Sequence, residues 1–248
     1  MKKLFLFIAA ILIMASFSKN SMGQGDNLTN KLTKKEIKKG WKLLWDGTSS
    51  SGWRSVNSKT FPQTGWEMKD GILSVISSEE QPKRGGDIVT IEKFKSFELM
   101  IDFLYTKGAN SGIKYFIGPE SEKGTISSVG CEYQVLDDKN HPDAKAGFEG
   151  NRTLSGLYDL IAPVNKTDNG FDNWNHAVII VKGNHVEHWL NGKKTVEFER
   201  KSPQWYALVA KSKFKDTKGF AEVEEGHILL QDHGNKVSFR NIKIREIK

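Results

Sequence analysis

The chain has 248 residues, 38% of which are hydrophobic, and its formal net charge is +7. This length suffices for one sizeable core, and all-β sandwiches often run to roughly 200–250 residues as one domain. The sequence contains no dense basic run among aromatic residues, so a basic solvated surface is favoured over a nucleic-acid-binding one. Its one cysteine, Cys131, excludes an intramolecular disulfide.

The first 23 residues predict a secretory signal peptide. Two lysines at positions 2 and 3 precede an apolar run of about 14 residues, and small residues follow at positions 21–23. An apolar run of this length is short for a membrane span. We expect cleavage before Gln24 and a mature protein in the periplasm or outside the cell, with no stable membrane insertion.

The next part of the chain predicts a short helix and then strands. Residues 24–39 form a polar lead and a helix, for which Thr33 is the N-cap and Glu36 completes a capping box. Residues 41–47 predict a strand that ends in a turn. Asp70 and Gly71 predict a hairpin between residues 66–68 and 72–75. The expected strands after it cover residues 85–91, 97–105, 111–117 and 131–136.

The C-terminal half continues the strand pattern. The expected strands cover residues 174–182, 185–190, 193–198, 226–230 and 236–244. Roughly a dozen strands with only one or two short helices predict a single all-β sandwich or barrel domain over residues 40–248. The segment 137–171 is long and irregular, which is typical of a functional or mobile loop.

Polar residues gather at the end of one predicted strand. Gln231, Asp232 and His233 follow the apolar residues 226–230 directly, and Gly234 comes next. These three side chains can donate or accept hydrogen bonds, and two of them can bind metal ions. Structural proteins seldom place such a group at a strand end, so we interpret it as a candidate functional site.

A second polar centre lies on the strand 131–136. The period of two in a strand places Glu132 and Gln134 on one face and Tyr133 and Val135 on the other. A strand that merely faces solvent would give the same pattern. We favour a binding face, on which a carboxylate and an amide contact a hydroxylated ligand, because residues 137–138 extend the polar end.

Asn110 and Lys114 form a third polar centre, on the strand before it. Gly108 and Gly112 allow a ligand or a second strand to approach the backbone closely. Lys114 could bind a sugar hydroxyl or stabilise an enolate, although a surface lysine is the more common situation.

Histidines and the long segment supply further candidates. His188 is a candidate partner of Glu132, or else a satisfied strand histidine. His185 and His188 fall on opposite faces of their strand and therefore make a weak metal motif. Arg152 and Tyr158 lie in the long segment, and Tyr158 is expected to line a cleft.

Motifs of several enzyme classes are absent. The sequence has no phosphate-binding loop, no Gly-x-Ser-x-Gly elbow and no His-Glu-x-x-His. The Glu-x-Asp-x-x-Glu strand of laminarinase-type sandwiches is also absent. A retaining glycosidase needs two carboxylates about 5 Å apart, and no strand here carries an alternating carboxylate pair.

Six short motifs in order resemble the 3-keto-disaccharide hydrolase family over about residues 40–248. They occupy residues 40–47, 110–113, 132–137, 174–176, 188–192 and 230–234. The resemblance implies a concanavalin A-like jelly roll of two antiparallel sheets with the ligand on the concave sheet. It also implies action on glycosides whose C3 hydroxyl has been oxidised to a ketone. Residues 137–173 are an insertion-like departure from the family pattern, so the resemblance does not fix the substrate size.

The implied chemistry gives roles to the polar residues. A 3-keto group acidifies the C2 hydrogen, so that a base can remove it, the C1 substituent can leave and water can add. We expect Glu132 and His233 to transfer the protons and Asp232 to orient His233, while Asn110, Lys114 and Gln134 bind hydroxyls or the ketone. The further candidates for substrate contact are Asp138, Arg152, Tyr158, His188 and Gln231.

The cofactor and the partners follow from the same resemblance. A divalent metal at Glu132, Asp232 or His233 is an open alternative as the electrophile, because one carboxylate and one imidazole are too few ligands to establish it. The partners implied are an oxidised carbohydrate substrate and a dehydrogenase that oxidises sugars at C3. Three other readings stay open: a non-catalytic carbohydrate-binding jelly roll, an ordinary hydrolase of unoxidised glycosides, and an interaction domain of an envelope complex.

Overall fold

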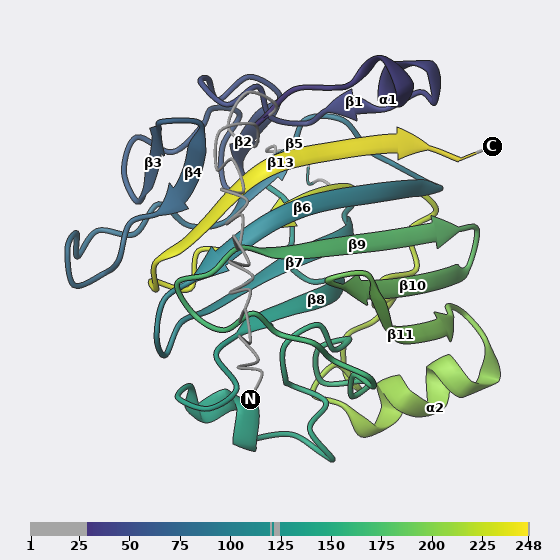
Figure 1. Cartoon of the computed structure of the whole chain (residues 1–248). Coiled ribbons are helices and arrows are strands. Elements are labelled where there is room, and N and C mark those ends of the chain that lie inside the picture. Colours follow the sequence, from purple (N-terminus) through teal and green to yellow (C-terminus); the bar gives the residue numbers. More distant parts are fainter. Residues whose placement is uncertain (1–28, 120, 122–124, 248) are drawn as a thin grey trace, which may run out of the picture.

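Two antiparallel sheets face each other in the computed structural model, which describes residues 29–119, 121 and 125–247 (Figure 1). The eight-stranded sheet has the order β11-β10-β9-β6-β13-β4-β3, and β1 also pairs with β13. Its strands are β1 (Lys42–Leu43), β3 (Trp66–Lys69), β4 (Ile72–Val75), β6 (Phe97–Tyr105), β9 (Asn175–Lys182), β10 (His185–Leu190), β11 (Lys193–Glu199) and β13 (Val237–Glu246). The predicted jelly-roll sandwich of two antiparallel sheets is confirmed.

The second sheet has five strands in the order β2-β5-β12-β7-β8. They are β2 (Trp53–Ser55), β5 (Ile88–Thr90), β7 (Asn110–Ile117), β8 (Cys131–Leu136) and β12 (His227–Leu230). Figure 1 shows β7 and β8 behind β6 and β9, so the core lies between these strand pairs. The opposite face of β7 and β8 is therefore free to carry a site.

The core forms because the strands alternate in burial. Along β6, Phe97 and Phe103 are buried while the residues between the inward positions are half-buried. These inward rings meet rings of the facing sheet: Phe97 lies edge-on to Tyr115, and Phe103 lies edge-on to Tyr133. Such packing between two inner faces fixes the sheets relative to each other.

Within the described part of the chain, two α-helices lie outside the sheets. Helix α1 (Lys34–Lys38) begins at Thr33, and the predicted capping box with Glu36 is present. Helix α2 (Pro203–Lys211) was not predicted, although Ser202 caps it and Pro203 starts it, which is a common helix start. Its buried Trp205 stacks between two phenylalanine rings. In the described residues no helix is long and apolar enough to cross a membrane, and the expected signal segment lies outside those residues.

His188 belongs to the core, so the prediction that it contacts substrate or Glu132 is wrong. Its side chain is fully buried between the sheets, on the same strand face as Val186 and Leu190. Its Nδ1 lies 3.1 Å from the Ser155 carbonyl, to which it must donate, so its Nε2 accepts from the Tyr115 hydroxyl at 2.7 Å.

This buried ring predicts a pH-dependent stability. Burial lowers the pKa of His188 to about 4, against an ordinary value of 6.5. Between these values the unfolded chain binds more protons than the folded one, so the free energy of unfolding falls as the pH falls from 6.5 to 4. The expected loss is about 3 kcal/mol, since one pKa unit corresponds to about 1.4 kcal/mol. Urea unfolding of wild type and His188→Asn at several pH values measures it. The variant should be less stable at pH 7 but flatter across this window, and an unchanged slope would contradict the assignment.

Candidate active site

The outer face of β7 and β8 carries the polar residues that the strand period predicts. The two strands pair with Gly112 opposite Gln134 and Lys114 opposite Glu132. The residues between them, such as Ile113 and Tyr133, point into the core. Asn110 begins β7 and extends the same row of outward positions.

The carboxylate of Glu132 lies at the centre of this face. The residue is only 7% exposed, and its Oε2 lies 3.5 Å from the Lys114 ammonium. Its Oε1 lies over Gly112, because a Cβ atom added to that glycine would come within 2.2 Å of it. Burial raises the pKa of Glu132, and the charges of Lys114 and Lys213 partly oppose this rise. A carboxylate with a raised pKa is suited to accept a proton near neutral pH.

Two buried amides beside Glu132 have unused hydrogen-bonding atoms. Gln134 is 1% exposed, and neither its Oε1 nor its Nε2 has a partner among the residues that the structure describes. The Oδ1 of the buried Asn110 is likewise unpaired within them. Leaving a buried polar group unpaired costs about 1–3 kcal/mol, so a hydroxylated ligand that paired these atoms would bind favourably.

The long segment continues the sheet beyond the edge of β8. The amide of Ser155 donates to the Gln134 carbonyl at 2.8 Å, and the amide of Tyr158 donates to the Glu132 carbonyl at 3.0 Å. Leu157, opposite Tyr133, is buried in the core, so the adjacent Tyr158 faces the site. The irregular segment is thus part of the site wall.

One aspartate, Asp143, joins Arg152 to Tyr158, and a second, Asp159, also binds Arg152. The Arg152 guanidinium donates to Asp159 at 2.5 Å and to Asp143 at 2.9 Å. The Tyr158 hydroxyl donates to Asp143 at 2.9 Å, and burial together with this bond raises its pKa. Tyr158 therefore keeps its proton, and Arg152 is a positioning residue behind it.

A hollow of about 380 Å³ adjoins this wall. It is lined by Asn110, His141, Pro142, Asp143, Ala146, Tyr158 and His233. The rings of His141 and His233 are nearly perpendicular, with centroids 6.0 Å apart. Partial burial lowers the pKa of His233, and the charge of Arg84 lowers it further. The neutral ring of His233 can therefore take up a proton in the hollow.

Asp232 supports the backbone around His233. Its carboxylate accepts hydrogen bonds from the amides of Gly86 at 2.8 Å and Gly234 at 2.9 Å, and Arg84 lies 3.4 Å away. These contacts hold the strand end in place, whereas no described contact joins the carboxylate to the His233 ring. The expected orientation of His233 by Asp232 stays a prediction, and it would act through the loop rather than by a direct contact.

Two other predicted residues are engaged within the protein. The Asp138 carboxylate accepts from the Leu154 amide and pairs with Lys166, which ties the long segment to the end of β8. Gln231 is anchored by its backbone, since its amide donates to the Gly112 carbonyl at 3.0 Å. The residue is half-buried.

Lys213 and His141 were missed by the sequence analysis. Lys213 follows α2, and its amide donates to Asp159 at 2.7 Å. Its ammonium lies 4.1 Å from the centre of the Tyr158 ring and acts electrostatically on Glu132. No local sequence pattern predicts that Lys213 lies at the site, because its position depends on contacts between residues that are far apart in the chain.

The open alternative of a metal at Glu132, Asp232 or His233 is not matched by the donor atoms. Over the described part of the chain, these three side chains do not bring ligand atoms within 4.8 Å of one another. The Asp232 carboxylate is moreover occupied by backbone amides. The residues present do not fit an ion there, and no step below goes through one.

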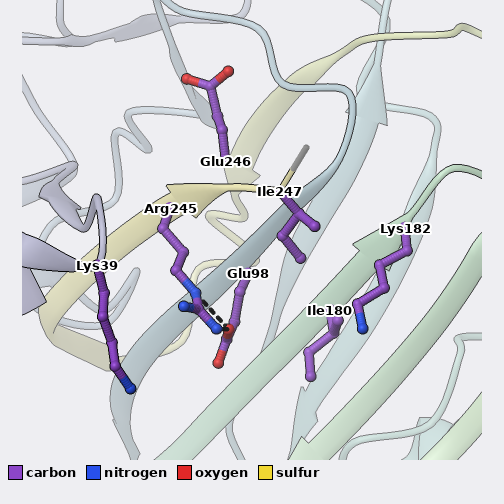
Figure 2. A pocket seen from close by; sticks show the side chains of 7 residues that line it. All are labelled: Lys39, Glu98, Ile180, Lys182, Arg245, Glu246 and Ile247. Atoms are coloured by element: carbon purple, nitrogen blue, oxygen red, sulfur yellow. Dashed lines mark hydrogen bonds and ion pairs between the residues drawn. The ribbon is translucent and has the colours of Figure 1, made fainter.

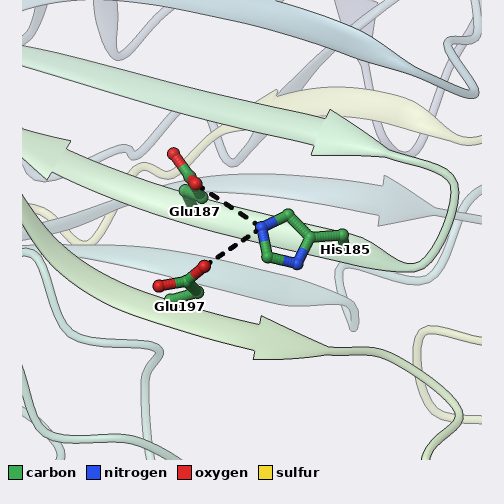
Figure 3. A group of neighbouring side chains, drawn as sticks. All are labelled: His185, Glu187 and Glu197. Carbon is green, nitrogen blue, oxygen red and sulfur yellow. Dashed lines mark hydrogen bonds and ion pairs between the residues drawn. The ribbon is translucent and has the colours of Figure 1, made fainter.

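A group with metal-ligand side chains lies on the other sheet. Figure 3 shows the ring of His185 between Glu187 and Glu197, with its Nε2 3.4 and 3.3 Å from their oxygens. The ammonium of Lys194 pairs with both carboxylates. A lysine cation already contacts both carboxylates, so we assign the group to surface ion pairing.

A second hollow, of about 490 Å³, lies on the outer face of the eight-stranded sheet (Figure 2). Its wall includes Arg245, which binds Glu98 through Nε at 2.8 Å and Nη2 at 2.5 Å. Both bonds end on Oε2 of Glu98, so the cation and the carboxylate are paired with each other. In contrast to the face around Glu132, the wall of this hollow has no unpaired buried side-chain atom within the described residues, so it is a weaker candidate.

Solved structures share this fold. A crystal structure from Parabacteroides distasonis ATCC 8503, provisionally described as a glycosyl hydrolase, has a TM-score of 0.77 and 29% sequence identity and covers 89% of this chain and 100% of its own. A second structure from that organism, with the same description, has a TM-score of 0.58 and 25% identity and covers 79% of this chain and 99% of its own.

Sequence comparison confirms the resemblance found in the motifs. A 3-keto-disaccharide hydrolase of Bacteroides thetaiotaomicron is 36% identical over 227 residues, which are 83% of this chain and 78% of that protein. A family model described as the 3-keto-alpha-glucoside-1,2-lyase-like domain matches residues 40–245, which include the face around Glu132 and the hollow beside it. The chain therefore belongs to the family of 3-keto-alpha-glucoside-1,2-lyase-like domains and is a glycoside-acting enzyme.

Proposed function

We propose that this enzyme cleaves glycosides whose C3 hydroxyl has been oxidised to a ketone. The observation that carries the proposal is the buried carboxylate of Glu132, 3.5 Å from Lys114, on a face with unpaired buried amides. This arrangement supplies a base, a cation and hydroxyl-binding groups. The nearby Asp143 and Asp159 are bound to Arg152, so neither is a free partner for a mechanism with two carboxylates.

The first half of the reaction is an elimination. Glu132 takes the C2 proton of the 3-keto sugar, and the electron pair of that bond forms an enolate with the C3 ketone. The Lys114 ammonium stabilises the negative charge, and the charge of Lys213 contributes from further away. The enolate then expels the C1 oxygen substituent, which takes up a proton and leaves as an alcohol, and an enone with a C1–C2 double bond remains.

The second half is a hydration. Water adds its oxygen to C1 of the enone, and C2 regains a proton, so the net result is hydrolysis of the glycosidic bond. His233 suits the proton transfers to and from oxygen, because its neutral ring lines the hollow beside Glu132. Gln134 and Asn110 would hold sugar hydroxyls through their unpaired amide atoms.

This activity requires a supply of oxidised sugar. We propose that a dehydrogenase which oxidises sugars at C3 provides it, and that the signal-like residues 1–23 direct the enzyme to the periplasm or the outside of the cell. The name of the Bacteroides thetaiotaomicron relative supports the substrate class.

A comparison of matched substrates tests the proposal. The protein beginning at Gln24 is incubated with a 3-keto-glucoside and with the same unoxidised glucoside, and release of the aglycone is followed. We expect release from the keto form alone, because only the ketone acidifies the C2 hydrogen. Release from the unoxidised form would favour an ordinary hydrolase, and sugar binding without release from either would favour a binding module.

A further inference from the structure

A row of polar positions crosses the five-stranded sheet on the same outer face as the candidate site. Gln134 is paired with Gly112, and the registers of β12 with β7 and β5 continue this row through Gln231 to Asp87, which directly precedes β5. The neighbouring positions on these strands all lie in the core: Ile113, Leu230 and Ile88. Because side chains alternate between the two faces of a sheet, Asp87 belongs to the outer face.

The Asp87 side chain is held in place but keeps one oxygen free. Its Oδ1 accepts from the backbone amide of Asp232 at 2.9 Å, and the Asp232 carboxylate accepts in return from the amide of Gly86 at 2.8 Å. This reciprocal pair of bonds joins the start of β5 to the end of β12. Among the described residues, no hydrogen bond or ion pair reaches Oδ2 of Asp87. A fixed carboxylate with a free oxygen is a preorganised acceptor for a hydroxyl group.

Asp87 and Glu132 flank the central part of this face. Two strand spacings, roughly 10 Å, separate the backbone of Asp87 from that of Gly112, over which the Glu132 carboxylate lies. The two carboxylates are close enough to interact, since burial raises the pKa of Glu132 and the charge of Asp87 raises it further, against the opposing lysines. The half-buried Gln231 lies between them. A sugar ring held at Glu132 can therefore extend across β12 toward Asp87.

The reacting carbons orient the ring over this gap. In the proposed reaction, C2 lies at Glu132 and the C3 oxygen lies at Lys114. C5, which carries the hydroxymethyl arm, is across the ring from C2. The side beyond β8 is closed, because the amides of Ser155 and Tyr158 bind the edge of that strand. The hydroxymethyl arm is thus directed over β12, where Asp87 stands.

We propose that Asp87 determines specificity by accepting a hydrogen bond from the C6 hydroxyl of the oxidised sugar unit. A hydrogen bond to a carboxylate is charge-assisted and stronger than one between neutral groups. The preferred substrate is then a 3-keto hexoside with a free C6 hydroxyl, whereas a pentoside or a sugar substituted at O6 loses the contact. This inference rests on the function proposed above, from which it takes the position of C2.

One substitution removes the free acceptor and keeps the contact with Asp232. Asp87→Asn retains Oδ1, which accepts from the Asp232 amide, and replaces Oδ2 by an NH₂ group. Wild type and variant are assayed on a 3-keto-glucoside and on the matching 3-keto-6-deoxyglucoside, on the plateau of the pH profile, so that a change in the pKa of Glu132 has no effect. Asp46→Asn is the matched control, because Asp46 also accepts backbone amides but lies near Thr90, at the other end of β5.

The expected losses depend on the C6 hydroxyl. On the 3-keto-glucoside, Asp87→Asn should lose at least about tenfold in kcat/KM, because a charge-assisted hydrogen bond is lost. Wild type should lose a similar factor when the C6 hydroxyl is absent. On the 6-deoxy substrate the variant should stay within about twofold of wild type, since the contact is already missing. Asp46→Asn should match wild type on both substrates, and thermal unfolding checks the fold of each variant.

Two outcomes would overturn the inference while the proposed function stands. Equal losses of Asp87→Asn on both substrates would place Asp87 in the chemistry or in the support of the loop, and no loss on either would show that Asp87 does not contact the sugar. Failure of wild type to turn over either keto substrate would refute the proposed function and this inference together.

Discussion

Replacing Glu132 by glutamine is expected to lower kcat on a 3-keto-glucoside by about 10²–10⁴-fold, the usual contribution of a general base. Glutamine has the same shape but cannot take up the C2 proton. The carboxylate is buried, lies 3.5 Å from Lys114 and has a raised pKa, all of which suit it to that task. Steady-state kinetics measure the effect, and thermal unfolding checks that the variant is folded.

Glu98→Gln is the matched control for this substitution. Glu98 also pairs with a cation, Arg245, but it lies on the outer face of the eight-stranded sheet. We expect this variant to keep wild-type kcat. Full activity of Glu132→Gln would remove Glu132 from the mechanism, and equal losses in both variants would point to a general effect of broken ion pairs.

Adding one methyl group at Gly112 is expected to impair catalysis without harming the fold. The backbone of Gly112 is within a regular strand and has no left-handed conformation, so alanine fits it. The new Cβ would come within 2.2 Å of Glu132 Oε1, and the flexible carboxylate would have to move aside. A displacement of about 1 Å can cost about 10²-fold in rate, so we expect a loss of this order in kcat for Gly112→Ala.

A double variant tests whether the loss acts through Glu132. In a Glu132→Gln background the carboxylate is already absent, so Gly112→Ala should add little further loss in kcat. Additive losses would show that the methyl group obstructs the substrate instead. The thermal midpoint of Gly112→Ala should stay close to that of wild type, because removing a strand glycine itself stabilises by about 0.4–1 kcal/mol.

Local sequence patterns predicted the strands except β2, and they predicted one face of the site. The strand 131–136 has the bounds expected from its alternation, and Glu132 and Gln134 share a face as the period of two requires. The hairpin at Asp70 and Gly71 and the capping box at Thr33 also follow from short-range chemistry. These features depend on residues that are close together in the chain, so they can be predicted from the sequence alone.

The same alternation could have excluded His188. In β10 it shares its face with Val186 and Leu190, which are both buried. Its polar ring suggested a functional site, but its place in the alternation of the strand indicated that it faces the core. A buried histidine is satisfied when both ring nitrogens find partners, as they do in Tyr115 and Ser155.

Long-range packing decided the rest of the site. His141 and Lys213 reach the site because the long segment follows the edge of β8 and the chain after α2 returns to Asp159. Neither contact has a local signal in the sequence. The contacts of Asp232 likewise could not be predicted from the sequence. Its carboxylate accepts from the nearby amide of Gly234, but also from the amide of Gly86, which is far away in the chain.

The most direct test of the proposed mechanism follows the hydrogen on C2. A 3-keto-glucoside labelled with deuterium at C2 is incubated with the enzyme in ordinary water, and the label in the early product is measured against the same substrate kept without enzyme. Elimination by Glu132 requires the C2–D bond to break, so the account predicts a product that has lost its deuterium to solvent. A product that retains the label at C2 would contradict proton abstraction and would indicate direct displacement at C1.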